Sequence, residues 1–463
     1  MARPADLVHS VIKAYDVRGV VGEQIDEAFV SDVGAAFARL IREEGVSGRV
    51  VVGHDMRDSS PTLSAAFAQG VCAQGLDVVL IGLASTDQLY YASGIMDCPG
   101  AMFTASHNPA KYNGIKLCRA GAKPVGQDSG LATISDGVVD GVPSYDGDIG
   151  SVTEQDVLED YATFVRELVD ISGIRSLSVA VDAGNGMGGH TVPAVLTPTP
   201  VTVHPLFFEL DGTFPNHPAN PLEPENLVDL QRAVREHGAD LGIAFDGDAD
   251  RCFVVDEQGG AVSPSAVTAL VAEREIERAR AEGVENPVII HNLITSRAVP
   301  ELVTARGGRP VRTRVGHSFI KAVMAEEGAV FGGEHSAHYY FKDFFNADTG
   351  MLAAMHLLAA LGEQDGPLSE LMHRYDPYAA SGEINSTVED KAGAVRRVVD
   401  ALAGRDVSVE ELDGTTLSCP DEGWWFNLRP SNTEPFLRLN VEAPDTAAME
   451  AVRDTVLGIV RQG

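Results

Sequence analysis

The sequence has few cysteines and no long hydrophobic run, and both absences exclude classes of protein. Its five cysteines are an odd number, widely scattered and without a CxxC pair, so neither a disulfide framework nor a zinc site is indicated. No stretch approaches the roughly 18 uninterrupted apolar residues of a membrane helix. The opening MARPADLVHSVIKAYDVRGV also lacks the apolar core of a signal peptide. We therefore expect free, mostly buried thiols in a cytoplasmic protein.

Positive charge is also scarce. The 35 lysines and arginines face 67 acidic residues, which gives a formal net charge of -32. This balance argues against nucleic acid or an anionic membrane as a partner, because both are polyanions that need basic patches. An anionic substrate would have to meet basic residues that are concentrated locally. The 463 residues, with 22% charged and 44% apolar side chains, are typical of a multidomain globular protein.

Short β-branched runs alternate with helical patterns through about the first 360 residues, which indicates an α/β protein built from βαβ units with a largely parallel sheet. The expected strands include RVVVGHD, DVVLIG, GIKLC, SLSVAVDAGNG, LGIAFDGDAD, NPVIIHN and AVFGGEHS. Apolar residues that recur at intervals of three and four predict helices at Leu63–Gln74, Glu154–Val169, Glu225–His237 and Met351–Leu361.

Breaks in this pattern predict four domains. Glycine, proline and polar residues gather at Tyr145–Ser151, at Gly259-Gly260 and across Gly362–Gly382. The predicted domains are 1–148, 149–256, 257–368 and 369–463. In the last one, from near Glu383, WWFNLRPSNTEPFLRLNVEA predicts two strands around a loop, and a helix follows at Thr446–Val460. We expect this part to be a small α+β domain.

The sharpest local signal is DGDADR, which places carboxylates at alternate positions directly after an apolar strand. Asp246, Asp248 and Asp250 would repel one another unless a cation joined them, and hard oxygen ligands suit Mg²⁺. The alternative is a solvated acidic turn. An EF-hand is disfavoured because Arg251 occupies the position that requires glycine and the flanking segments resemble strands.

Two further segments combine hydroxyl and imidazole groups. TASHNP suits an ordinary turn made by Asn108 and Pro109, but it also leaves the Ser106 hydroxyl directly after an apolar run. In GGEHSAH, Glu334 and Ser336 lie two residues apart, so an extended backbone would direct both side chains to one side, where they could bind the hydroxyls of a sugar. A polar loop is the alternative for this segment.

The segment RPSNTEP lies between two predicted strands and suits a phosphate group. Its arginine offers a planar pair of donors, and serine, threonine and backbone N–H groups can contact the remaining oxygens. A hairpin turn is the alternative. Basic residues elsewhere could assist with the same anion, although a single such residue is usually solvated at the surface. These residues are Arg18, Lys116, Arg251 and His317.

Together these segments resemble the α-D-phosphohexomutase family, in particular its bacterial phosphomannomutase/phosphoglucomutase branch. The motifs YDVRG, TASHNP, DGDADR, GEHSAH and RPSNTEP occur in the family order, and the likeness covers nearly the whole chain. The resemblance implies three topologically similar α/β domains with mixed sheets and a smaller C-terminal α+β domain, arranged around a central cleft.

The resemblance also implies an isomerase that carries a phosphoryl group on Ser106. That group is given to one end of a hexose monophosphate, forming a hexose 1,6-bisphosphate, and the other phosphoryl returns to the serine. Mg²⁺ would bind the phosphoserine and the three aspartates. The site residues expected are, for catalysis, Ser106, His107, Lys116, Arg18 and His317, with Lys116 and His317 as acid/base candidates; for the metal, Asp246, Asp248, Asp250 and Ser106; and for the substrate, Tyr15, Arg251, Glu334, Ser336, His338, Arg429, Ser431, Asn432 and Thr433.

The sugar loop favours mannose, and also glucose, over an aminosugar. A phosphoglucosamine mutase usually resembles GEQSGH where this chain has GEHSAH, with His335 in place of the glutamine. A phosphoglucosamine mutase, a phosphoserine-dependent sugar phosphatase and a catalytically silent sugar-phosphate sensor are the alternatives. The sensor is disfavoured because Ser106 and all three aspartates are present. We expect a monomer or a homodimer that acts on small hexose phosphates.

Overall fold

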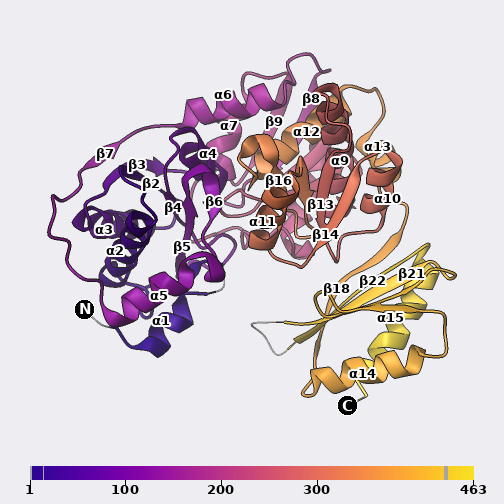
Figure 1. Ribbon diagram of the computed structural model, residues 1–463. Helices are drawn as coiled ribbons and strands as arrows, with labels where there is room; N and C mark the ends of the chain where they lie inside the picture. Colours follow the sequence, from indigo (N-terminus) through magenta and orange to yellow (C-terminus); the bar gives the residue numbers. More distant parts are fainter. Residues whose placement is uncertain (1–2, 14, 432–435, 463) are drawn as a thin grey trace. The chain divides into compact units, whose positions relative to one another are not determined.

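The computed structural model describes residues 3–13, 15–431 and 436–462. The chain divides into two units, each with its own hydrophobic core. The first unit runs to Val262 and also contains Met324–Glu326 and Ser336–Ser369. The second contains Ser263–Val323, Glu327–His335 and the chain from Glu370 onwards. Figure 1 traces the described chain and labels many of its helices and strands.

The first unit is the larger of the two. It contains every element before α9 in Figure 1 and the elements of Ser336–Ser369. Its strands are β1 (Val17–Val20), β2 (Arg49–His54), β3 (Asp77–Leu83), β4 (Gly100–Phe103), β5 (Tyr112–Arg119), β6 (Lys123–Pro124), β7 (Val152–Glu154), β8 (Leu177–Asp182), β9 (Val201–Leu206), β10 (Leu241–Phe245), β11 (Cys252–Asp256), β12 (Ala261–Val262), β16 (Tyr339–Phe341) and β17 (Ala347–Asp348). Its helices are α1 (Ala5–Val11), α2 (Glu27–Glu43), α3 (Ser60–Ala73), α4 (Thr86–Ile95), α5 (Leu131–Asp140), α6 (Leu158–Leu168), α7 (Gly188–Leu196), α8 (Val228–His237) and α12 (Gly350–Gly362).

The sheets of the first unit are mixed rather than largely parallel. The first has the order β1-β5-β4-β2-β3-β7, in which β5 runs antiparallel to β1 and β4 while the others pair in parallel. The second has the order β12-β11-β10-β8-β9 and is parallel at β8, β9 and β10. Strand β10 is buried along its whole length, which explains why its sequence is a continuous apolar run.

A column of aromatic rings fixes β4, the strand that leads into TASHNP. The ring centroids of Phe37 on α2 and Phe67 on α3 are 6.0 Å apart, and Phe67 lies edge-on to Phe103 of β4 at 5.6 Å. All three rings are fully buried. Burying side chains of this size stabilises a fold by roughly 1.5–3 kcal/mol each, so the end of β4 is firmly anchored.

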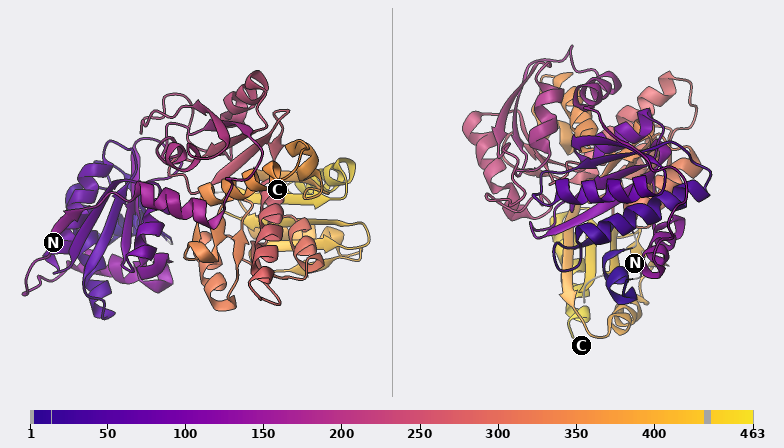
Figure 2. Two further views of the ribbon diagram at one scale, coloured as in Figure 1. Left: turned by 90° about the horizontal axis from the view of Figure 1, so that it is seen from above. Right: turned by 90° about the vertical axis from the view of Figure 1, so that its left-hand side faces the viewer.

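The second unit combines an α/β part with an antiparallel sheet, which is orange to yellow in Figure 2. Strands β13, β14 and β15 pair in parallel, and the C-terminal sheet has the order β18-β22-β21-β20-β19 with every pair antiparallel. Its elements are α9 (Pro264–Ala281), β13 (Val288–Asn292), α10 (Ala298–Ala305), β14 (Arg309–Thr313), β15 (Phe331–Gly333), β18 (Ala379–Thr387), α14 (Lys391–Leu402), β19 (Ser408–Glu410), β20 (Thr415–Cys419), β21 (Trp424–Pro430), β22 (Phe436–Ala443) and α15 (Thr446–Val460), while α11 (His317–Glu327) and α13 (Leu368–His373) cross the division.

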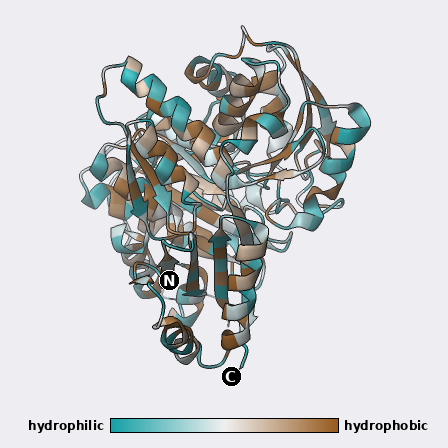
Figure 3. Cartoon of the chain, turned by 90° about the vertical axis from the view of Figure 1, so that its right-hand side faces the viewer, coloured by the Kyte–Doolittle hydropathy of each residue, from teal (hydrophilic) through white to brown (hydrophobic). Residues whose placement is uncertain are grey.

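All five predicted helices occur, and four of them start at a residue other than the predicted one. The helix predicted from Glu154 begins only at Leu158, because Glu154 pairs with Leu80 as the last residue of the edge strand β7. A short 3-10 turn precedes α8, which therefore begins at Val228. The first strand of the C-terminal sheet begins at Ala379, four residues before Glu383, near which the α+β pattern was predicted to begin. Several helices carry both teal and brown residues in Figure 3, as an amphipathic pattern requires.

The structure bears on the state of the cysteines and on the hydropathy of the helices. The five cysteines are free and buried, as their scattered spacing predicts. Within the described ranges, no helix combines the length and the hydropathy that crossing a bilayer requires.

Candidate functional site

The Ser106 hydroxyl lies at the carboxyl edge of the first sheet, in the loop after β4. Strand β2 runs parallel to β4, with His54 opposite Phe103, so the residues after both strands meet at this edge. The backbone of Ser106 has a positive φ of 48°, in the left-handed region that a serine seldom adopts. Such a conformation costs on the order of 1–3 kcal/mol and persists only where the surroundings hold it.

The acidic turn of DGDADR connects β10 to β11 and faces this serine. Ser106 Oγ donates a hydrogen bond of 2.8 Å to Oδ2 of Asp246. The serine is 6% exposed and the carboxylate is fully buried. Gly247 permits this approach, because a Cβ at that position would lie 2.4 Å from the carbonyl oxygen of Ser106. The two segments predicted to act together are therefore in direct contact.

Two cations, the partly buried Lys116 and the buried Arg251, partly neutralise the three aspartates. Lys116 Nζ donates to Oδ2 of Asp248 at 2.7 Å and to Oδ2 of Asp250 at 2.5 Å. Burial opposes the charge on this ammonium, but the two carboxylates raise the pKa of Lys116 well above its ordinary value. Arg251 Nε lies 2.9 Å from Oδ2 of Asp246. Burial nevertheless raises the pKa of Asp246, and the neighbouring aspartates raise it further.

The aspartate triad fits a metal ion. One oxygen from each of Asp246, Asp248 and Asp250 can be chosen so that all three lie within 4.8 Å of one another. Oδ1 of Asp248 and Oδ1 of Asp250 are buried and have no hydrogen-bond partner among the described residues. A buried carboxylate oxygen without a partner is costly, and a cation would remove that cost. The triad can therefore hold a metal ion, and carboxylates are ligands that suit Mg²⁺.

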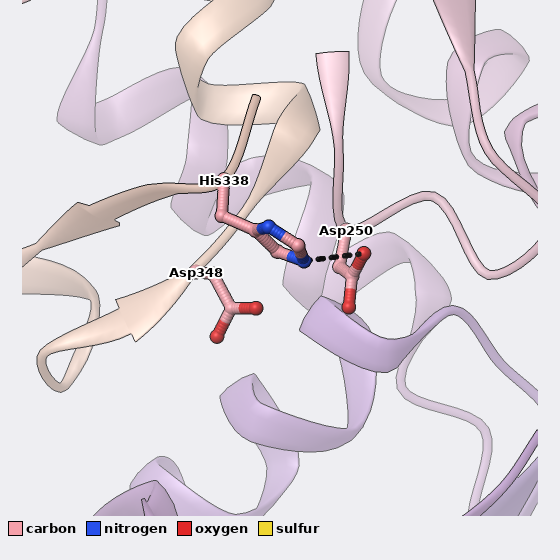
Figure 4. A group of neighbouring side chains, drawn as sticks. All are labelled: Asp250, His338 and Asp348. Atoms are coloured by element: carbon pink, nitrogen blue, oxygen red, sulfur yellow. Dashed lines mark ion pairs between the residues drawn. The ribbon is translucent and has the colours of Figure 1, made fainter. Parts of the chain in front are cut away.

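His338, expected from sequence to bind substrate, lies beside the acidic turn. Its backbone forms an antiparallel bridge with Arg251, and its Nε2 is 3.7 Å from Oδ1 of Asp250. Figure 4 shows this imidazole directed at Asp250, with Asp348 alongside. These three side chains form a second group of potential ligands that shares Asp250 with the triad. Asp348 was not predicted, because nothing near it in the sequence resembles a site.

Several residues contact the loop between β4 and β5 that contains Ser106, called the serine loop below. Arg18, which the sequence predicts to act in catalysis, donates from Nη1 to the carbonyl oxygen of Ala105 at 3.0 Å and to Oδ1 of Asn108. His107 Nδ1 lies 3.2 Å from Ser106 Oγ and 2.7 Å from Nη2 of Arg251. Sequence reasoning missed Arg57, a fully buried side chain that contacts the same loop. Its position two residues after Asp55, at the end of a buried strand, is the sequence feature that could have identified it.

The remaining predicted residues of the first unit have fewer assigned contacts. Ser336 Oγ is 3.0 Å from Nδ1 of His338. Tyr15 is half-buried and lies two residues before the start of β1. Their roles toward a substrate stay predictions.

In the second unit, Glu334 is 2% exposed and its Oε1 accepts hydrogen bonds from Nδ2 of Asn292 at 3.1 Å and from a backbone N–H at 3.3 Å. Arg429 lies near the end of β21, with Nη2 3.5 Å from Oε2 of Glu383. The backbone N–H of Ser431 donates to the carbonyl oxygen of Phe436 at 2.9 Å. The predictions for Asn432 and Thr433, and for the side chain of His317, concern parts of the chain outside the described residues.

The fold and the site define a multidomain α/β protein that brings a serine hydroxyl against a carboxylate triad. Comparison with known proteins gives the family. Four consecutive segments match the descriptions phosphoglucomutase/phosphomannomutase alpha/beta/alpha domain I (residues 9–138), domain II (159–260), domain III (263–378) and C-terminal domain (383–459). The chain belongs to this phosphohexomutase family, whose members are isomerases acting on sugar phosphates.

Individual relatives agree with this assignment over nearly their whole length. A phosphomannomutase of Escherichia coli is 37% identical over 461 residues, covering 97% of this chain and 98% of the relative. A protein of Xanthomonas campestris pv. campestris described as phosphohexose mutases is 38% identical over 455 residues, covering 97% and 99%. The crystal structure of a phosphoglucomutase/phosphomannomutase family protein from Burkholderia thailandensis superposes with a TM-score of 0.87 at 30% identity, covering 100% and 99%.

Proposed function

We propose that the chain interconverts hexose 6-phosphate and hexose 1-phosphate, acting on mannose and also on glucose phosphates. Ser106 would carry the phosphoryl group, and a hexose 1,6-bisphosphate would be the intermediate. The observation that carries this proposal is the 2.8 Å contact between Ser106 Oγ and Asp246, one of three buried aspartates that fit a metal ion. The names of the relatives support mannose as one of the sugars.

The transfer needs a donor, an acceptor and a route for one proton. In the first half, the P–Oγ bond of phosphoserine 106 breaks as an oxygen of the sugar hydroxyl bonds to phosphorus; the hydroxyl proton passes to a base, and Oγ takes up a proton as it leaves. After the bisphosphate turns end for end, its other phosphoryl moves to Oγ, which gives up its proton, and the sugar oxygen that is released takes up a proton. Bound Mg²⁺, held by the aspartate triad, would offset negative charge on the phosphoryl oxygens.

Lys116 and His317 remain the candidates for moving this proton. Because the carboxylates of Asp248 and Asp250 raise the pKa of Lys116, its ammonium holds its proton at neutral pH. It is therefore suited to donate a proton, or to stabilise the transferred group by its charge, rather than to act as the initial base. Arg251, His107 and Arg18 would surround the phosphoserine, at the positions described above.

Further residues would recognise the rest of the substrate. Glu334 and Ser336 would bind sugar hydroxyls in a manner usable in both orientations, and Tyr15 and His338 would also contact the substrate. Arg429 and Ser431, with Asn432 and Thr433, would hold the phosphate that is not reacting. Binding this distant phosphate would keep the bisphosphate in place while it turns.

A comparison of substrates tests the proposal. We expect kcat/KM for mannose 1-phosphate and glucose 1-phosphate to exceed that for glucosamine 1-phosphate when each is assayed with a trace of hexose 1,6-bisphosphate. A preference for glucosamine 1-phosphate would instead indicate an aminosugar mutase. Release of inorganic phosphate faster than isomerisation would indicate a phosphatase. Ser106→Ala is the control and should be inactive on every sugar.

A further inference from the structure

Every hydrogen-bond donor of the Arg57 side chain contacts the serine loop, the first residue of β5 or Asp55, which directly follows β2. Nη2 donates to the carbonyl oxygens of Ser106 at 2.9 Å and Asn108 at 2.7 Å. Nη1 donates to those of Pro109 at 3.0 Å and Tyr112 at 3.1 Å. Nε is 3.1 Å from an oxygen of the neighbouring aspartate. A guanidinium has five N–H groups, and each of them has an acceptor here.

This guanidinium is itself held rigidly. Its side chain is 1% exposed, and the carboxylate of Asp55 that accepts from Nε also accepts from the backbone N–H of Arg57 at 3.0 Å and from Ser60 Oγ at 2.6 Å. On the other side, the guanidinium carbon lies 5.1 Å from the ring centroid of Phe214. The donors of Arg57 are therefore fixed in position before any substrate arrives.

We propose that Arg57 is a positioning residue that holds Ser106 in its left-handed backbone conformation, so that Oγ points at Asp246. This inference rests on the proposed role of Ser106 as phosphoryl carrier. Arg57 has no N–H left for a phosphate oxygen, so it acts through the loop and not on the substrate. Arg18 contacts the loop at other atoms and does not bond to the carbonyl of Ser106.

The requirement is for arginine and not only for positive charge. The four loop carbonyls come from residues spread between positions 106 and 112, and a planar guanidinium can reach them from two nitrogens at once. A lysine offers its donors from a single nitrogen and cannot bond to all of them. A misplacement of about 1 Å at a reacting group can cost roughly 100-fold in rate.

The test measures phosphoryl transfer from glucose 1,6-bisphosphate to dephosphorylated Ser106 by rapid quench, together with kcat and KM of the mutase reaction. We expect Arg57→Lys to lower the transfer rate and kcat by about 100-fold while KM changes less than about threefold. Arg166→Lys is the matched control. Arg166 lies on α6, and its Nη1 donates a hydrogen bond of 2.7 Å to the carbonyl oxygen of Ala194. This variant therefore also removes a hydrogen bond from a guanidinium to a carbonyl, but one away from the loop of Ser106. The control should transfer phosphate at the wild-type rate.

Chemical rescue separates positioning from a general loss of stability. In Arg57→Ala, millimolar guanidinium should restore part of the transfer rate, whereas ammonium should not. A wild-type transfer rate in Arg57→Lys would overturn the inference, as would an equal loss in Arg166→Lys or equal rescue by ammonium. If Arg57→Ala does not fold, the lysine variant and its control decide. A wild-type protein without mutase activity or phosphoserine would instead refute the proposed function itself.

Discussion

Replacing Lys116 with methionine should destabilise the metal-free protein and make its stability strongly dependent on a divalent cation. Lys116 contacts Asp248 at 2.7 Å and Asp250 at 2.5 Å, and the two carboxylates are 0% and 2% exposed. Removing one partner of a buried ion pair costs about 3–5 kcal/mol, because the remaining charge is left without compensation. We expect a loss of free energy of unfolding in this range in EDTA. Saturating Mg²⁺ should recover most of it, since the ion would supply the missing positive charge.

Urea unfolding of both proteins, with and without Mg²⁺, measures this effect. The exposed Lys123 offers a matched control, and Lys123→Met should change the free energy of unfolding by no more than about 0.5 kcal/mol. The deficit of Lys116→Met should shrink at acid pH, where the aspartates can take up protons instead. A deficit below about 1 kcal/mol in EDTA, or one that Mg²⁺ leaves unchanged, would refute the view that Lys116 and a metal ion neutralise the same carboxylates.

Three further outcomes are expected. Asp248→Asn should weaken Mg²⁺ binding, measured by calorimetry, at least about 100-fold, while the circular dichroism spectrum stays that of the native protein. An unchanged affinity would argue against the triad as the metal site. Arg429→Ala should lower kcat/KM by about 10–100-fold, through both a higher KM and a lower kcat, and wild-type constants would remove its phosphate role. Burial raises the pKa of Asp87 from 3.8 to about 6, although Tyr161 donates to it. Because the folded state holds this proton more tightly, its contribution to stability is greatest below about pH 4 and declines by about 3 kcal/mol as the pH rises past 6. The free energy of unfolding of Asp87→Asn should lack this decline, and a pH profile identical to wild type would contradict the assignment.

The elements set by local pattern could be predicted from the sequence. The apolar run before DGDADR became the fully buried strand β10, and the alternating carboxylates that follow became the triad. The last helix occupies Thr446–Val460, as predicted, because the apolar period defines its face and Asp445 accepts a hydrogen bond from the backbone of Ala448 at its first turn. In each case the deciding residues are neighbours in the chain.

The features that the sequence did not predict depend on residues that are distant from one another in the chain. Glu154 joins an edge strand because β3 offers it a pairing partner, which no helical periodicity reveals. Arg57 and Ser106 meet because β2 lies beside β4 in register, and a single sequence does not show which strands become neighbours. Asp348 reaches Asp250 for the same reason, from a hairpin almost a hundred residues downstream.

Intact-mass analysis combined with peptide mapping tests most directly whether Ser106 carries the transferred group. After incubation with glucose 1,6-bisphosphate and Mg²⁺, the protein should gain one phosphoryl group located on Ser106, and it should lose that group when excess hexose monophosphate is added. Ser106→Ala should neither gain the group nor isomerise a hexose phosphate. A phosphoryl group found on another residue, or full mutase turnover by Ser106→Ala, would contradict the account.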